Sequence, residues 1–152
     1  MEKFKSKIIL FFIILFICGC NDGILALNSN EPFYFKFKNS ELTLANHDSF
    51  GIIFITKECG ACKEQLKYLK NSKFNFIVVL GDAKDMNDAL NFAKDKNINF
   101  PLIFDKDSVL FLSNAVGGIN GVPVTFIYNK NNKKRFLGLT PKNIIDNEIK
   151  NL

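Results

Sequence analysis

The sequence FGIIFITKECGACKEQLKYL, residues 50–69, joins an apolar run to a helical pattern through a pair of cysteines. The run over residues 50–55 is rich in β-branched side chains, so it predicts a strand that is buried on both faces of a sheet. From Cys59 onward the spacing becomes helical, with Cys62 on the apolar stripe. A Cys-X-X-Cys pair that follows a buried strand and begins a helix is typical of a redox site.

The chemistry expected of this pair is thiol–disulfide exchange. A thiolate is the attacking species, and the free N–H groups and positive dipole end of a helix N-terminus stabilise it. Cys59 at the helix start is therefore the predicted nucleophile, and Cys62, one turn further in, is the predicted resolving thiol. Lys57 and Lys63 are expected to add positive potential near the pair, while Glu58 opposes it.

Other uses of the cysteines fit the sequence less well. A zinc site needs three or four protein ligands, but the chain has a single histidine, His47, and no second Cys-X-X-Cys, so no metal is predicted. A purely structural disulfide would close a loop too small to constrain much of the unfolded chain. His47 lies in the polar segment LANHDS and is predicted to be a surface turn residue.

The N-terminus is predicted to be an export signal. Lysines at positions 3, 5 and 7 precede the apolar run of residues 8–17, which is shorter than the roughly 20 residues of a membrane-spanning helix. The following sequence ICGC, residues 17–20, resembles the bacterial lipobox, and that resemblance implies lipid attachment at Cys20. The alternative is an uncleaved signal anchor with two incidental cysteines.

This interpretation divides the chain into three parts. Residues 1–19 would be a lipoprotein signal peptide, residues 20–30 a lipid anchor and tether, and residues 31–152 one folded domain. The protein would be held on a membrane through Cys20 and face the periplasm or the outer side of the cytoplasmic membrane, where disulfides persist.

The remaining elements are predicted from apolar spacing and turn residues. They alternate at first between strand and helix, which predicts a parallel pair, and end in an antiparallel hairpin and a helix. The predicted strands are residues 33–38, 41–44, 50–55, 74–80, 100–104, 122–128 and 134–138. The predicted helices are residues 59–69, 85–96 and 141–150, with one or two further helical turns within 109–115.

Composition excludes several classes of protein. Of 152 residues, 23% are charged, which is close to the globular average and argues against disorder. The net charge of +5 is too small and too scattered to predict nucleic-acid binding.

A second motif, GVPVTF at residues 121–126, together with the cysteine pair resembles the thioredoxin superfamily. The resemblance covers about residues 31–151 and is closest to the envelope-facing TlpA/ResA/DsbE-like branch, which has similar FP-x-x-x-D and GVP-x-T-F segments. It implies a thioredoxin-like α/β fold: a central mixed β-sheet flanked by helices, with an extra N-terminal β-hairpin and an inserted helix. It also implies that Pro123 is cis and faces a Cys59–Cys62 redox disulfide, and that the Val122 backbone pairs with a substrate polypeptide.

The function implied by this resemblance is a thiol–disulfide oxidoreductase of the protein-disulfide reductase type. Its partners would be proteins with disulfides or vicinal thiols, apocytochrome c among them, and a membrane thiol that donates electrons; no organic cofactor is implied. Three alternatives stay open: a disulfide oxidase or isomerase, a non-catalytic binding module on the same fold, and a metal carrier.

The sequence departs from the family pattern around the cysteines. Glu58 stands where members commonly have tryptophan, and Ala61 where many have proline. Gln65 stands where many TlpA-type reductases have glutamate, and Ile53 where thioredoxins have a buried acid. Glu64 is then the candidate proton relay. The absence of a histidine between the cysteines favours a reductant or isomerase.

Overall fold

The computed structural model describes residues 23–129 and 132–152. The predicted signal peptide and Cys20 therefore lie outside the described residues. Within those ranges no helix is both long and apolar enough to span a membrane. The strands are β1 Phe35–Lys38, β2 Glu41–Leu44, β3 Ser49–Ile55, β4 Phe76–Leu80, β5 Leu102–Ile103, β6 Val124–Asn129 and β7 Asn132–Leu137. The helices are α2 Gly60–Leu69, α3 Met86–Asp95, α4 Lys106–Ala115 and α5 Lys142–Lys150.

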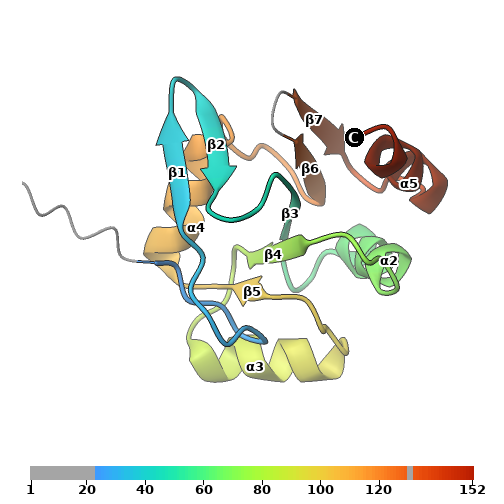
Figure 1. Cartoon of the computed structure of the whole chain (residues 1–152). Coiled ribbons are helices and arrows are strands. Elements are labelled where there is room, and N and C mark those ends of the chain that lie inside the picture. Colours follow the sequence, from blue (N-terminus) through green and yellow to red (C-terminus); the bar gives the residue numbers. More distant parts are fainter. Residues whose placement is uncertain (1–22, 130–131) are drawn as a thin grey trace, which may run out of the picture.

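Five strands form a mixed sheet in the order β5-β4-β3-β6-β7, and β1 and β2 form a separate antiparallel hairpin (Figure 1). β3 is central because its apolar run is buried on both faces, as predicted. It pairs in parallel with β4 and antiparallel with β6, so the expected parallel pair and C-terminal hairpin are both present.

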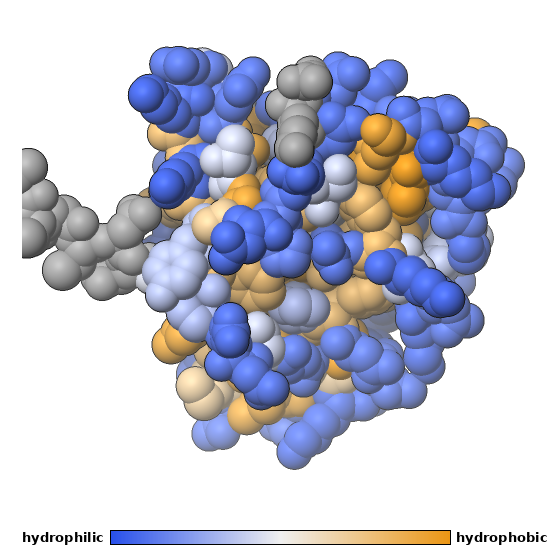
Figure 2. All heavy atoms as spheres, in the orientation of Figure 1, coloured by the Kyte–Doolittle hydropathy of each residue, from blue (hydrophilic) through white to orange (hydrophobic). Residues whose placement is uncertain are grey.

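Two apolar clusters cover the two faces of this sheet. One face packs against α4 and the β1–β2 hairpin, through residues that include Leu112 and Phe35. The other packs against α2, α3 and α5, and it contains Cys62 and Ile145. In the view of Figure 2, hydrophilic side chains cover most of the outline and hydrophobic ones show between them.

Most elements begin and end within two residues of their predicted bounds, but α4 is longer than expected and β5 is much shorter than the predicted strand. The helical turns expected within residues 109–115 are the end of α4, which begins at Lys106 and is capped by the Asp105 carboxylate accepting the Ser108 N–H at 2.9 Å. Its first turn is polar, so hydrophobic spacing did not reveal it. The extended piece expected over residues 100–104 contributes only the two residues of β5 to the sheet.

The segment before Pro32 is attached to the sheet, although a tether was expected up to residue 30. Leu27 and Leu102 exchange two backbone hydrogen bonds of 2.9 Å, and the Asn28 amide donates to the Ile98 carbonyl at 2.9 Å. This contact covers the outer edge of β5, which would otherwise expose unpaired backbone groups. From residue 24 on, the expected tether therefore belongs to the folded domain.

Gly51 interrupts the apolar run of β3 opposite Phe76 of β4, whose ring occupies the space that a side chain would need. A Cβ atom at this position would lie 2.3 Å from the Phe76 ring. Phe76 is fully buried and packs edge-to-face on Phe74 and Phe100, so it has no room to move. The glycine leaves space for the ring that fills the core below α2.

Tyr128→Phe is expected to leave stability unchanged or to raise it by about 1 kcal/mol. The Tyr128 hydroxyl is buried and has no hydrogen-bond partner among the described residues, so removing it loses no bond. Burial also raises the pKa of this phenol above its ordinary value. The unfolded chain then ionises first as pH rises past about 10, and the wild type loses stability there.

Urea unfolding at pH 7 and at pH 10.5 checks this expectation, with the exposed Tyr68→Phe as the matched control. The loss of stability between the two pH values should be smaller in Tyr128→Phe than in the control. A Tyr128→Phe variant that is destabilised by more than 1 kcal/mol at pH 7 would contradict it.

Candidate redox site

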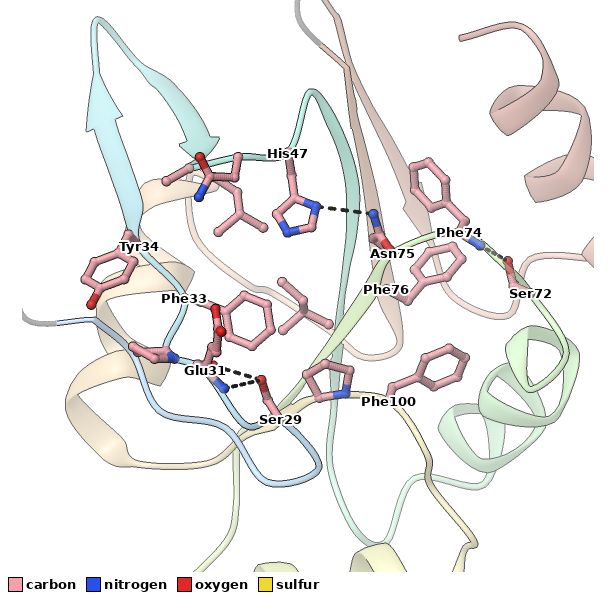
Figure 3. Close-up of a pocket in the computed structure, with 16 residues that line it drawn as sticks. Ser29, Glu31, Phe33, Tyr34, His47, Ser72, Phe74, Asn75, Phe76 and Phe100 are labelled. Atoms are coloured by element: carbon pink, nitrogen blue, oxygen red, sulfur yellow. Dashed lines mark hydrogen bonds between the residues drawn. The ribbon is translucent and has the colours of Figure 1, made fainter.

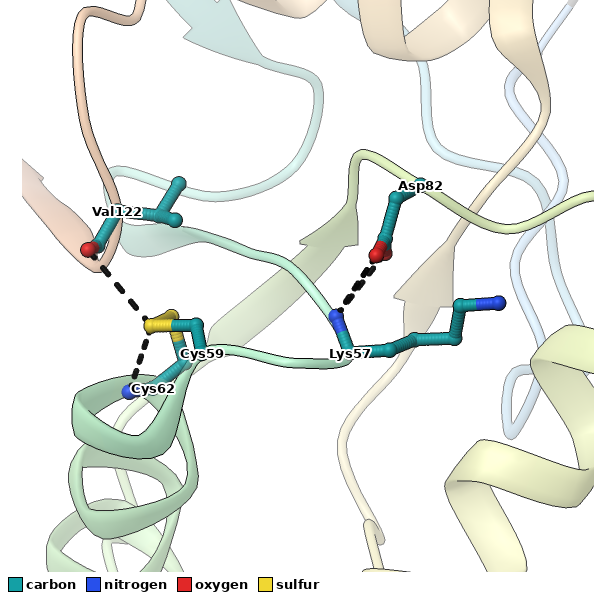
Figure 4. The surroundings of a disulfide bond; sticks show 5 residues. All are labelled: Lys57, Cys59, Cys62, Asp82 and Val122. Carbon is teal, nitrogen blue, oxygen red and sulfur yellow. Dashed lines mark hydrogen bonds between the residues drawn. A yellow bond between two sulfur atoms is a disulfide. The ribbon is translucent and has the colours of Figure 1, made fainter.

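The two cysteines lie at the carboxyl end of β3, where α2 begins, and form a disulfide with a Cα–Cα distance of 5.2 Å (Figure 4). Cys59 is the N-cap residue of α2, and its sulfur accepts the Cys62 N–H at 3.0 Å. Cys59 is partly exposed, while Cys62 is fully buried. The outer sulfur can therefore meet a partner, and the helix N–H groups are placed to stabilise it as a thiolate.

The Val122–Pro123 loop faces the outer sulfur. The Val122–Pro123 peptide bond is cis, as the family resemblance implies. The Val122 carbonyl oxygen lies 3.7 Å from Cys59 Sγ, within reach of an S–H donor once the disulfide is reduced. Pro123 is buried, and its carbonyl accepts the Gly138 N–H at 2.8 Å. The structure thus brings four sequence-predicted residues, Cys59, Cys62, Val122 and Pro123, to one place.

Lys57 does not contribute to the sulfurs in the way the sequence suggested. Its side chain points away from Cys59 and pairs with Asp88 on α3 (Figure 4). This contact raises the pKa of Lys57 and lowers that of Asp88 relative to their ordinary values. The Lys57 N–H donates to both Asp82 oxygens, at 3.0 and 3.1 Å, so the residue anchors the loop before Cys59.

Glu64, the candidate proton relay, lies on the outer surface of α2. Its carboxylate pairs with Lys67 at 2.6 Å, and the Glu64 side chain is about half exposed while that of Lys67 is largely exposed. The next residue, Gln65, is fully buried instead. Its amide oxygen accepts the Thr140 N–H at 2.7 Å, and its amide nitrogen donates to the Thr140 carbonyl at 3.1 Å.

The interior near Cys62 is free of ionisable acids in the part of the chain that the structure describes. Among all the described residues, the buried polar ones are Gln65, Thr125 and Thr140, and none of them has an ionisable acid group. Ile53, at the position of the thioredoxin acid, is fully buried in the same apolar cluster as Cys62. A proton that reaches Cys62 must then come from the solvent side of the site.

A pocket of about 270 Å³ adjoins Val122 on the side of α4. Uncharged residues line it throughout: Phe54, Ile55, Thr56, Gly81, Val109, Ser113, Ile119, Asn120, Gly121 and Val122. Sequence spacing did not reveal this pocket, because its wall comes from four separate segments. Val122, whose carbonyl faces Cys59, forms part of this wall.

Figure 3 shows a larger pocket, of about 510 Å³, whose lining includes neither cysteine. Phe76 at the beginning of β4 lines it, whereas Cys59 follows the end of the parallel strand β3, so the two sites are at opposite ends of the sheet. His47 is exposed there, in the turn predicted for it, and its Nδ1 lies 3.2 Å from the Asn75 amide. Rings of Phe33, Phe74 and Phe100 form much of the wall. This pocket is a seam between the N-terminal segment and the sheet, away from the redox pair.

Comparisons with known proteins bear on the fold. No family profile matches the sequence, and no curated protein matches it. Solved structures do match. A DsbF homologue from Corynebacterium diphtheriae aligns over 90% of this chain and 96% of its own, with a TM-score of 0.56 and 18% identity. A thiol:disulfide interchange protein of the thioredoxin family from Chlorobium tepidum aligns over 85% and 95%, with a TM-score of 0.55 and 16% identity. A secreted Mycobacterium tuberculosis disulfide oxidoreductase homologous to DsbE aligns over 69% and 82%, also with a TM-score of 0.55 and 16% identity.

These likenesses show that the fold is thioredoxin-like: a five-stranded mixed sheet flanked by helices, with a separate N-terminal hairpin. The fold expected from the sequence is therefore confirmed. The chain combines this fold with a Cys-X-X-Cys pair at the start of α2.

Proposed function

We propose that this protein is a thiol–disulfide oxidoreductase that reduces disulfides in other proteins. One observation carries the proposal: a partly exposed sulfur caps α2 and faces the Val122 carbonyl, while its disulfide partner is buried behind it. An outer nucleophile and an inner resolving thiol are what exchange through a mixed disulfide requires. Two of the similar solved structures are described as a disulfide oxidoreductase and as a thiol:disulfide interchange protein, which agrees with this function.

The proposed reaction begins from the reduced pair. The Cys59 thiolate attacks a substrate disulfide, whose S–S bond breaks as the mixed disulfide forms and one substrate thiolate leaves. The Cys62 thiolate then attacks Cys59 Sγ and displaces the second substrate thiolate. Two electrons pass to the substrate, and the protein is left with the Cys59–Cys62 disulfide seen here. A thiol donor in the membrane would reduce that disulfide again, and no organic cofactor takes part.

The substrates proposed are exported proteins that carry disulfides or vicinal thiols, and apocytochrome c is one candidate. The pocket beside Val122 holds no charged side chain, which favours segments with uncharged residues next to the attacked cysteine. Substrate capture with a Cys62→Ser variant would identify them, and recovery of no exported protein would exclude this class.

The reduction potential of the Cys59–Cys62 couple tests the direction of transfer. Equilibration of the purified chain with dithiothreitol or glutathione mixtures is expected to give a value near thioredoxin's, about −270 mV. A value near −120 mV would make the protein an oxidase instead. A chain that never forms the disulfide would point to a binding module, or to a metal carrier if the reduced protein holds stoichiometric metal.

We further propose that the protein acts in the cell envelope, anchored by lipid on Cys20. The order of basic, apolar and small residues before Cys20 supports this. Cells grown with a labelled fatty acid should label the wild type, and the Cys20→Ser variant should lose the label. Equal labelling of the two proteins would refute the anchor.

A further inference from the structure

A closed set of contacts connects α2 to the loop that faces its own N-terminal sulfur. Gln65 lies one turn after Cys62, and its amide forms two hydrogen bonds with the Thr140 backbone. The Thr140 hydroxyl donates to the Gly138 carbonyl at 3.3 Å, and the Gly138 N–H donates to the Pro123 carbonyl at 2.8 Å. The preceding residue, Val122, places its carbonyl 3.7 Å from Cys59 Sγ.

Gln65 is the side chain that joins the helix to this circuit. The other contacts are made by backbone atoms of the β7–α5 turn and of Val122 and Pro123, together with the Thr140 hydroxyl and the Cys59 sulfur. Both hydrogen bonds between the Gln65 amide and Thr140 are buried, since Gln65 is 0% and Thr140 7% exposed, so water cannot replace them. Loss of the amide would leave the Thr140 N–H and carbonyl without their partner and would release the turn from α2.

The chemical type of the side chain fits this role. An amide offers one acceptor and two donor hydrogens, so it can satisfy the N–H and the carbonyl of one residue at the same time. An ionised carboxylate is an acceptor only, and it would place negative charge against the Thr140 carbonyl. A glutamine here holds the turn in the same way at every pH.

We propose that Gln65 is a positioning residue that holds the Val122–Pro123 loop at its distance from the Cys59 sulfur. The loop is then ready for a polypeptide that pairs with the Val122 backbone. This inference rests on the proposed function and adds that fast reduction of polypeptide disulfides depends on Gln65. Reduction of small disulfides does not depend on it, because they contact only the Cys59 sulfur.

Two substrates separate these roles in the reduced full chain. One is a synthetic peptide closed by a disulfide, and the other is bis(2-hydroxyethyl) disulfide. Gln65→Met keeps the length and the apolar packing but removes both hydrogen bonds. It is expected to lower the peptide rate constant about tenfold while the small-disulfide rate stays within about threefold. Lys67→Met, on the exposed side of the same helix, is the matched control and should leave both rates unchanged.

The Gln65→Glu variant gives a second measurement, the pH dependence of the ratio between the two rates. A purely structural role of Gln65 would not make this ratio depend on pH. A protonated carboxyl reproduces one donor and one acceptor, whereas the ionised form loses the donor. The ratio of peptide to small-disulfide rate should therefore equal that of the wild type at low pH and fall as pH rises, since burial raises the pKa of a carboxyl placed there. The wild-type ratio should not change with pH, because ionisation of the Cys59 thiol affects both rates equally and cancels in their ratio.

The results distinguish a failure of the Gln65 role from a failure of the proposed function. An unchanged ratio in Gln65→Met, or a ratio in Gln65→Glu that does not vary with pH, would overturn the role of Gln65 while leaving the oxidoreductase intact. If Gln65→Met fails to fold, the pH profile of Gln65→Glu decides. A wild type that exchanges with neither disulfide would refute the proposed function, and this inference with it.

Discussion

Cys59→Ser is expected to reduce disulfide exchange to the uncatalysed rate with every substrate. The Cys59 sulfur is the partly exposed member of the pair, and it lies 3.7 Å from the Val122 carbonyl oxygen. A serine hydroxyl in its place could still cap α2, so the fold should persist. It cannot form a mixed disulfide, and the buried Cys62 cannot reach a partner in its stead. The measurement is the rate of peptide disulfide reduction, with circular dichroism as the check on folding.

Cys62→Ser is the matched variant and should fail at a different step. Cys59 can still attack, but no resolving thiol follows, so the mixed disulfide should accumulate. Mass spectrometry of the trapped species would show one substrate molecule bound per chain through Cys59. Equal activity of Cys59→Ser and wild type would contradict the assignment. So would trapping by Cys59→Ser in place of Cys62→Ser, since it would make Cys62 the nucleophile.

Local patterns were sufficient for the elements that carry the cysteines. The apolar run before Cys59 and the helical spacing after it both lie within a few residues, so strand and helix followed from the sequence. The first turn of α4 was missed because Lys106 and Asp107 give no apolar periodicity, although Asp105 is a recognisable cap.

Contacts between distant segments did not follow from the sequence. Leu27 pairs with β5, yet its short apolar segment looks the same whether it is a tether or an edge strand. Gln65 and Thr140 are 75 residues apart, so no local sequence pattern indicates that the Gln65 amide binds the Thr140 backbone. The family resemblance shows that Gln65 stands where many reductases have glutamate, but only the structure shows what the Gln65 amide binds. Similarly, charge alone favoured Lys57 beside the sulfurs, whereas Asp88 on α3 draws it away.

Phe126→Ala is expected to lower the free energy of unfolding by about 3–5 kcal/mol. The Phe126 ring is completely buried and packs edge-to-face on Phe54, with centroids 6.0 Å apart. The Lys133 and Arg135 cations also lie over it, at 5.7 and 5.6 Å from its centroid. Truncation removes these contacts and leaves a cavity in the apolar cluster between the sheet and α4. Urea unfolding of the oxidised chain measures the loss.

Phe37→Ala is the control for this experiment, because Phe37 is 48% exposed on β1 and should lose far less than Phe126. The reduction potential of Phe126→Ala gives a second comparison. Phe126 packs into the cluster beside α4, on the opposite face of the sheet from Cys62. The mutation should therefore destabilise the oxidised and reduced forms equally, and the potential should move by less than about 30 mV, which corresponds to about 1.4 kcal/mol. A larger shift would mean that the two faces are not independent, and that the core beneath β6 tunes the redox pair.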